Sequence, residues 1–166
     1  MDAERERRAV VITVSDRSAR GRRADVSGPR AVELLRAAGW MADEPRVVPD
    51  GEASVREALS AALADGARLI VTSGGTGIAP RDETPEGTRP LLVRELPGIA
   101  EELRRRGAET VPTAVLSRGL AGIAAGSAGE ALVVNLPGSV DAVEEGIAVM
   151  LPLAAHVIDQ LDGRDH

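Results

Sequence analysis

A glycine-rich turn with charged residues beside it lies within residues 72–86, which read TSGGTGIAPRDETPE and follow the apolar run at 69–71. A buried strand that ends in such a turn leaves backbone N–H groups unpaired at the carboxyl edge of a sheet, where open α/β folds bind anionic ligands. The glycines alone are also typical of an ordinary tight turn. Because Arg81 and Asp82 follow them closely, we predict that the turn at 74–77 binds a phosphate.

The composition restricts the chemistry that this turn can serve. All 20 basic residues are Arg, and the sequence has no Lys, no Cys and only two His. These absences exclude a Schiff base, a thiolate nucleophile and a zinc site built from several histidines. No Lys follows the glycines as in a Walker loop, and the G-x-G-x-x-G spacing of a dinucleotide fold is missing. The residue types that remain suit metal-assisted phosphoryl or nucleotidyl transfer.

Length and charge define the class of protein. With 166 residues, of which 43% are hydrophobic, the chain predicts one compact domain with its own core. No leader sequence and no apolar run approaching about 18 residues is visible, so we expect a cytoplasmic protein without a membrane segment. The net charge of −6 argues against nonspecific binding to nucleic acid, which requires a basic surface.

Strand and helix patterns alternate along the chain and predict an α/β fold. Apolar runs predict strands, and helical spacing of apolar residues, with Pro at helix starts and Gly at helix ends, predicts helices. The predicted strands are at 9–14, 47–48, 69–71, 120–124 and 131–134. The predicted helices are at 27–38 and 55–63, after Thr84-Pro85, after Pro97-Gly98 and at 139–161. The polar segment 17–24, with its four Arg, is predicted to be a loop.

Three predicted strand exits carry acidic residues. Asp16 follows the first strand, Asp50 follows the second, and Asp82 lies beyond the glycine turn that follows the third. Parallel strands present their carboxyl ends at one edge of a sheet, so these acids are expected to converge. Two carboxylates together favour Mg²⁺, which would also offset the repulsion between an acidic protein and a nucleotide. An Asp beside Pro and Gly is also a common turn former, which leaves a purely structural role open for Asp50.

Five motifs in sequence order resemble the MogA/MoaB family of molybdenum-cofactor biosynthesis. They are SGGTG at 73–77, PRDETPE at 80–86, Pro97-Gly98, LSRG at 116–119 and NLPGS at 135–139. The resemblance implies a single molybdopterin-binding domain over residues 8–163, a three-layer α/β/α sandwich with a mostly parallel central sheet. It further implies a homotrimer or homohexamer, with ATP and molybdopterin as substrates, Mg²⁺ as cofactor, and other molybdenum-cofactor enzymes as partners.

The resemblance also assigns roles to individual residues. The essential acids of the family match Asp50 and Asp82, which are the expected catalytic residues and Mg²⁺ ligands. The pterin-side contacts match residues 117–118 and 135–139, and the first strand matches at residues 15–16 with a less defined role. The full set of expected substrate contacts is Ser15, Asp16, Gly74, Gly75, Thr76, Gly77, Arg81, Ser117, Arg118, Asn135, Pro137, Gly138 and Ser139.

This chain departs from the family pattern at three positions. Glu83 stands where an aliphatic residue is common, Gly87 where Ala is common, and Val140 where Pro often follows the PGS motif. Gly87 is expected to weaken its helix by about 1 kcal/mol relative to Ala.

The implied reaction agrees with the absence of Lys and the scarcity of His. The attacking group would be the terminal phosphate of molybdopterin, which is already an anion at neutral pH and needs no general base. The protein would align it with the α-phosphate of ATP and stabilise the pyrophosphate leaving group. Two alternatives stay open: a protein that binds molybdopterin without turnover, as a paralogue or scaffold, and a hydrolase of nucleotide pyrophosphate bonds.

Overall fold

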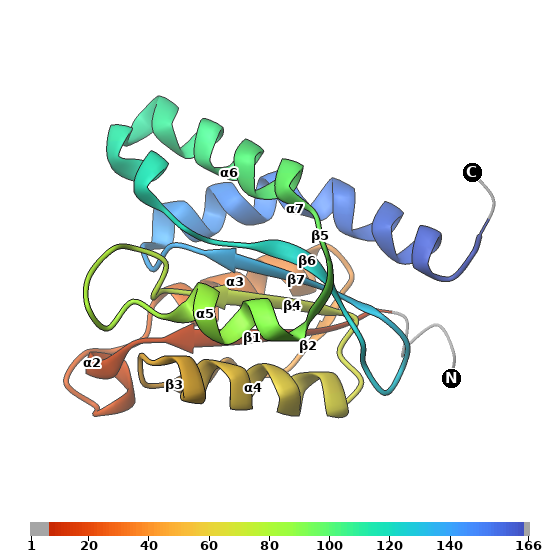
Figure 1. Ribbon diagram of the computed structural model, residues 1–166, viewed down its shortest axis with the longest axis horizontal. Helices are drawn as coiled ribbons and strands as arrows, with labels where there is room; N and C mark the ends of the chain where they lie inside the picture. The colour runs from red at the N-terminus through yellow and green to blue at the C-terminus, as the bar shows by residue number, and fades with distance from the viewer. Residues whose placement is uncertain (1–6, 165–166) are drawn as a thin grey trace.

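Within residues 7–164, seven strands form one sheet with helices packed on both of its faces (Figure 1). The computed structural model describes residues 7–164. The strands are β1 (Arg8–Val14), β2 (Met41–Ala42), β3 (Arg46–Val48), β4 (Leu69–Ser73), β5 (Leu92–Glu95), β6 (Ala121–Ala124) and β7 (Ala131–Leu136). The α-helices are α2 (Asp16–Ala19), α3 (Ser27–Ala37), α4 (Glu52–Ala64), α5 (Thr84–Thr88), α6 (Pro97–Thr110) and α7 (Val140–Leu161). The described part of the chain also contains two short 3₁₀ helices, η1 (Arg89–Leu91) and η2 (Pro112–Leu116).

The sheet is mostly parallel, as the sequence predicts. Its order is β2-β1-β4-β7-β6-β5, and β3 continues the edge begun by β2 by pairing with the second half of β1. The pairs among β1, β2, β3, β4 and β7 are parallel, whereas β6 runs antiparallel to both of its neighbours. Right-handed crossovers through helices are the usual way to join parallel strands, which agrees with the helices that separate β1, β3 and β4.

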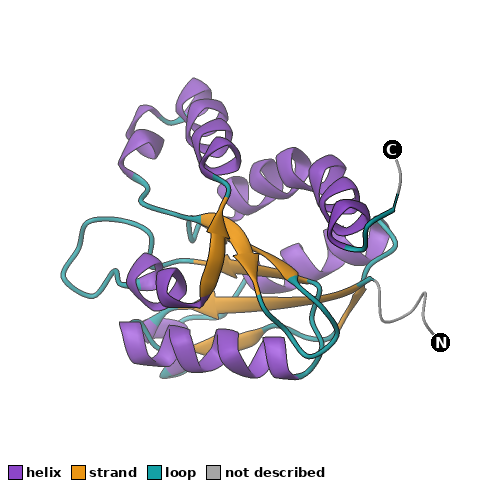
Figure 2. Ribbon diagram, turned by 45° about the vertical axis from the view of Figure 1, so that its right-hand side comes forward, coloured by secondary structure: helices purple, strands orange, loops and turns teal. Residues whose placement is uncertain are grey.

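The core has two layers, one on each side of the sheet. Alternate residues of β1 point to opposite faces: Val11 packs in the cluster that includes α3 and α7, and Ile12 packs in the cluster that includes α4. Figure 2 shows helices on both sides of the strands, with α6 and η2 farther from the sheet at one end. The three-layer α/β/α prediction is therefore confirmed. None of the helices within residues 7–164 is long and apolar enough to cross a membrane.

Several elements differ from the sequence prediction. The segment expected as a loop at 17–24 begins with helix α2, because the Ser15 hydroxyl accepts a hydrogen bond from the Ser18 N–H (3.2 Å) and caps it. Strands β2 and β5 were not predicted, because β2 has only two residues and β5 is mostly exposed and ends in two charged residues, so neither shows a buried apolar run. Helix α5 has only five residues and begins at Thr84 itself, not after Thr84-Pro85, and its N-cap residue is Glu83.

Gly87 also behaves differently from the expectation. It lies in α5 against α4, where a Cβ atom would be 2.7 Å from the main-chain oxygen of Glu52 and 2.8 Å from Cβ of Val55. Alanine does not fit at those distances unless one helix shifts. The expectation that glycine is the weaker choice here is wrong, because close helix packing outweighs helix propensity.

Candidate functional site

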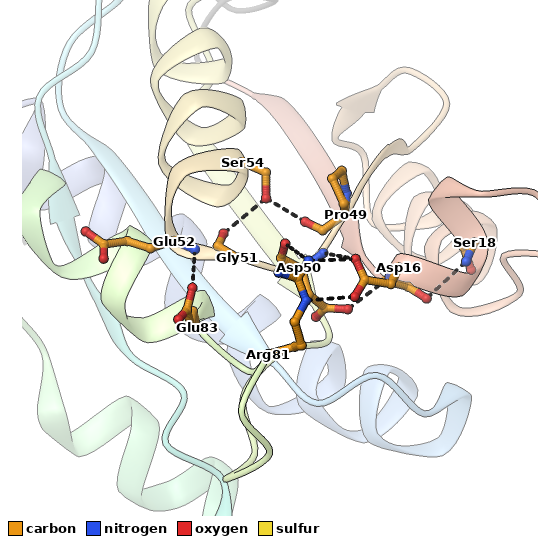
Figure 3. Close-up of polar contacts among 10 residues, drawn as sticks. Asp16, Ser18, Pro49, Asp50, Gly51, Glu52, Ser54, Arg81 and Glu83 are labelled. Carbon is orange, nitrogen blue, oxygen red and sulfur yellow. Dashed lines mark hydrogen bonds and ion pairs between the residues drawn. The ribbon is translucent and has the colours of Figure 1, made fainter.

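The site lies where β1, β3 and β4 end. Asp16 follows β1 and Asp50 follows β3, and the two acids exchange hydrogen bonds: the Asp16 N–H donates to Asp50 Oδ2 (2.9 Å) and the Asp50 N–H donates to Asp16 Oδ1 (3.2 Å). Figure 3 shows these residues with Arg81 beside them. The parallel register of β1 and β3 brings their carboxyl ends to one rim and so produces this contact.

The glycine turn after β4 has a conformation that requires glycine. Gly74 and Gly75 have φ angles of 106° and 68°, and a Cβ atom on Gly74 would lie 2.2 Å from the main-chain oxygen of Val14. The buried Thr84 holds the turn by donating its hydroxyl to the Gly74 carbonyl (2.9 Å) and its N–H to the Gly75 carbonyl (3.1 Å). Within residues 7–164, the N–H groups of residues 75–77 donate to no protein acceptor. They are therefore available to an anion.

Asp50 and Asp82 lie along this turn. A Cβ atom on Gly75 would be 3.3 Å from Asp50 Oδ1, and one on Gly77 would be 2.7 Å from Asp82 Oδ2. One oxygen of each carboxylate is engaged, because Asp50 Oδ2 accepts from the Asp16 N–H and Asp82 Oδ2 accepts from the Ala79 N–H (3.0 Å). Across the described residues, the Oδ1 atom of each has no hydrogen-bond partner.

This donor set suits Mg²⁺ shared with a phosphate. Mg²⁺ usually takes one or two carboxylates and completes its shell with water and substrate phosphates, so the two unpartnered Oδ1 atoms match its preference. No group of three or more acidic, His or Cys side chains that could hold a metal occurs among residues 7–164. A cation at Asp50 and Asp82 would therefore depend on the substrate for the rest of its ligands.

Arg81 connects the acid pair to the loop that carries Asp82. Its Nε and Nη2 donate to the two carboxylate oxygens of Asp16 (3.0 Å each), and Nη2 also donates to the Asp50 carbonyl (2.9 Å). The hydrogen bond from Arg81 lowers the pKa of the Asp16 carboxyl below its usual value, and the same contact raises the pKa of Arg81. Asp16 is therefore an anion paired with Arg81 at neutral pH.

Arg118 holds the other side of the same loop. Its guanidinium donates to the carbonyls of Gly77 (2.8 Å) and Asp82 (2.7 Å) and forms an ion pair with Glu86. The main-chain N–H of Arg118 donates to the Thr76 carbonyl (2.7 Å). The pKa of Glu86 is lowered, chiefly by the hydrogen bond from Arg118. In this structure the Arg118 side chain contacts the loop; a contact with substrate stays a prediction.

Asn135 lies beneath the site in a closed network of hydrogen bonds. Its side chain is buried, and Nδ2 donates to the hydroxyls of Thr72 (3.0 Å) and Thr88 (3.1 Å). Its Oδ1 accepts from the Leu120 N–H (3.0 Å). These bonds join β4, β7, α5 and the segment before β6. Asn135 therefore holds together the elements that lie beneath the glycine turn.

The turn borders one pocket, and a second pocket lies beside the residue that precedes the turn, Ser73. The larger, of about 600 Å³, is bordered by residues 74–77, Asp82, Ser117 and residues 137–139. The smaller, of about 310 Å³, includes Ser15, Asp25 and Ser73, and it shares Gly138 and Ser139 with the larger one. Ser139 caps α7 by accepting from the Ala142 N–H (3.1 Å), so the N-terminus of a 22-residue helix lies where the pockets meet.

The expected residues thus fall into three groups. The glycine turn, Asp82, Ser117, Pro137, Gly138 and Ser139 border the larger pocket, whereas Ser15 borders the smaller one. Asp16, Asp50 and Arg81 form one hydrogen-bonded cluster beside the turn. The side chains of Arg118 and Asn135 are engaged within the protein.

Sequence reasoning missed three residues that shape the site, namely Glu83, Thr84 and Glu86. Thr84 was used only to mark the start of a predicted helix, and Glu86 carries no signal for its partner, which lies 32 residues away. Glu83 was noted as a departure from the family pattern, and that departure was the available signal. Its carboxylate accepts a hydrogen bond from the Glu52 N–H (2.8 Å), 31 residues earlier in the chain.

Comparison with known proteins identifies the family of the chain. Residues 10–156 match the model of a family described as probable molybdopterin binding domain. The chain is 42% identical over 149 residues to a molybdopterin adenylyltransferase of Pyrococcus furiosus, with 89% of this chain and 87% of that protein covered. It is 37% identical over 164 residues to a molybdenum cofactor biosynthesis bifunctional protein of Chlorobaculum tepidum, with 99% of this chain and 51% of that protein covered.

A solved structure gives the same result for the fold. A MogA structure superimposes with a TM-score of 0.87 at 42% identity, covering 93% of this chain and 99% of that one. The chain spans about half the length of the first two curated relatives that it matches, both of which are bifunctional proteins. The chain therefore belongs to the family of probable molybdopterin-binding domains, and its resemblance to the MogA/MoaB proteins is confirmed.

Proposed function

We propose that the protein transfers the adenylyl group of ATP to molybdopterin in a Mg²⁺-dependent reaction, giving adenylylated molybdopterin and pyrophosphate. One observation carries the proposal. The free N–H groups of residues 75–77 lie beside Asp50 and Asp82, each of which keeps one carboxylate oxygen without a protein partner. Unpaired amides attract phosphate oxygens, and the two carboxylates suit a cation that would accompany them. The relative from Pyrococcus furiosus is named for the same activity.

The chemistry requires little from protein side chains beyond position and charge. A terminal phosphate oxygen of molybdopterin attacks the α-phosphorus of ATP, an anhydride P–O bond forms, and the bond to the β-phosphate breaks. The electron pair leaves with pyrophosphate. The backbone N–H groups of the turn orient phosphate oxygens, and Asp50 and Asp82 would hold Mg²⁺, which neutralises charge on the leaving group. No proton must be removed from the attacking phosphate, which agrees with the absence of Lys and the scarcity of His.

The two pockets provide room for two substrates. They meet at Gly138 and Ser139, beside the turn, so two ligands that occupy them would bring their ends together at the free amides. Volumes of about 600 Å³ and 310 Å³ are in the range of small-molecule sites. Alignment of two bound phosphates at that junction is the main rate advantage that the protein supplies.

A single incubation tests the proposal. Purified protein is mixed with ATP, Mg²⁺ and molybdopterin, and the products are separated by chromatography. Adenylylated pterin together with pyrophosphate supports the transferase. Cleavage of ATP without adenylylated pterin would instead indicate a hydrolase, and retention of pterin without any turnover would indicate a binding protein or scaffold. Omission of Mg²⁺ is the control for the metal requirement.

Assembly and location are part of the same proposal. The family resemblance favours a homotrimer or homohexamer in the cytoplasm, with other molybdenum-cofactor enzymes as partners. Light scattering coupled to size-exclusion chromatography measures the mass of the particle and so distinguishes the two assemblies from each other and from a monomer.

A further inference from the structure

The two residues that flank Asp82 both bind the turn that carries Asp50. On one side, Arg81 Nη2 donates to the Asp50 carbonyl (2.9 Å). On the other side, a Glu83 carboxylate oxygen accepts from the Glu52 N–H (2.8 Å). The loop that carries Asp82 is therefore fastened to the Asp50 turn at two points, one before and one after Gly51 (Figure 3).

The Asp50 turn needs such external support. Gly51 is the N-cap of α4 with a φ angle of 124°, and it has no side chain to satisfy the first N–H groups of the helix. Ser54 holds the turn from within by donating its hydroxyl to the carbonyls of Pro49 (2.6 Å) and Gly51 (3.0 Å). Glu83 supplies the cap that Gly51 lacks, and its negative charge suits the N-terminus of α4.

Besides its hydrogen bond to the Asp50 carbonyl, Arg81 positions the Asp50 carboxylate indirectly, through Asp16. The guanidinium holds both oxygens of Asp16, and the Asp16 N–H in turn holds Asp50 Oδ2. This leaves Asp50 Oδ1 on the side of Gly75 and of the glycine turn. A planar, two-pronged guanidinium can make these three contacts at once, whereas an ammonium group cannot.

We propose that Arg81 and Glu83 are positioning residues, which hold the Asp50 turn at a fixed distance from the loop of Asp82 so that both carboxylates face the phosphate-binding turn. This inference rests on the proposed adenylyl transfer for its kinetic consequence. Neither side chain needs to touch substrate. They hold Asp50 and Asp82, which follow different strands, in the right relative position before the substrates bind.

The Glu83 contact is tested with a pair of variants and a control. Glu83→Ala removes the acceptor for the Glu52 N–H, whereas Glu83→Gln retains a side-chain oxygen that can accept the same bond. Glu57→Ala, on the exposed face of α4, removes the same charge without a contact to the site. Hydrogen exchange of the Glu52 amide is measured by NMR, and kcat and KM are measured for adenylyl transfer.

We expect exchange of the Glu52 amide to become about tenfold faster in Glu83→Ala, with kcat lowered by a similar factor and KM for molybdopterin little changed. Glu83→Gln should restore most of both values, and Glu57→Ala should match the wild type. Unchanged exchange in Glu83→Ala would overturn the proposal, as would faster exchange with an unchanged kcat. If Glu83→Gln does not restore the slow exchange of the Glu52 amide, that result would also contradict the proposal.

Variants of Arg81 test the proposal independently of Glu83. Arg81→Lys keeps the charge and loses the two-pronged contact, so we expect a loss of kcat close to that of Arg81→Gln. Full activity of Arg81→Lys would refute the positioning role and leave only a role for its charge. If the wild-type protein makes no adenylylated pterin, the proposed function fails by itself. The exchange of the Glu52 amide then still decides whether Glu83 holds the turn.

Discussion

Asp16 and Asp50 are joined by a reciprocal pair of hydrogen bonds, in which the main-chain N–H of each donates to the carboxylate of the other. The residues are 34 positions apart and follow two adjacent parallel strands. Each carboxylate thereby fixes the main chain of its neighbour, and one oxygen of Asp50 remains for a ligand. The arrangement explains why an acid outside the expected catalytic pair belongs to the site.

Asp82→Asn should abolish adenylyl transfer without unfolding the protein. The amide oxygen of Asn can still accept the Ala79 N–H, so the loop keeps its shape, but the negative charge for a cation is lost. We expect a loss in kcat of at least about a hundredfold. The check is a steady-state assay together with thermal unfolding. An active variant would remove Asp82 from the mechanism, and Glu57→Gln serves as the neutral control.

Gly87→Ala should destabilise the protein although alanine is the better helix former. The new Cβ atom would lie 2.7 Å from the Glu52 carbonyl oxygen, so α4 and α5 must separate. We expect a loss of about 1–3 kcal/mol in the free energy of unfolding, measured in urea. The matched control is Gly98→Ala in α6, where nothing lies within 4 Å of the added Cβ atom. That variant should gain about 0.5–1 kcal/mol.

Arg118→Ala should loosen the loop that carries Asp82. The carbonyls of Gly77 and Asp82 lose their donor, and we expect a cost of about 1–3 kcal/mol in unfolding free energy. Glu86→Gln removes only the half-exposed ion pair and should cost less than about 1 kcal/mol. Equal costs for the two variants would show that the ion pair, and not the carbonyl contacts, holds the loop.

Acid should weaken the contacts that Asp16 and Glu86 make. Arg81 lowers the pKa of Asp16 below 3.8, and Arg118 lowers that of Glu86 below 4.5. A lowered pKa in the folded state means that the unfolded state binds protons first as the pH falls. The stabilisation is therefore complete above about pH 4.5 and disappears as the pH falls through the folded values. Urea unfolding across this range should show a weaker pH dependence for Glu86→Gln than for the wild type.

The sequence predicts the parts of this structure that depend on local pattern. The apolar runs of β1, β4 and β7 and the long stripe of α7 are recognisable, and the rule that parallel strands end at one rim brings Asp16 and Asp50 together. What it misses depends on contacts between distant segments. Glu83 as the cap of α4, Arg118 as a donor to the Gly77 carbonyl, and the fit of Gly87 against Val55 have no local signature. Very short strands such as β2 also lack enough residues to show a period.

The reversed direction of β6 determines which segment reaches the site from that side of the sheet. The residues that follow β1, β3, β4 and β7 lie at the site, whereas β6 brings the residues that precede it, because its amino end lies at the same rim. Arg118, three positions ahead of β6, thereby meets Thr76 and Gly77, which follow β4. Because β6 is antiparallel, a segment that precedes a strand lies among loops that follow strands. The contacts that Arg118 makes with the phosphate-binding turn depend on this direction of β6.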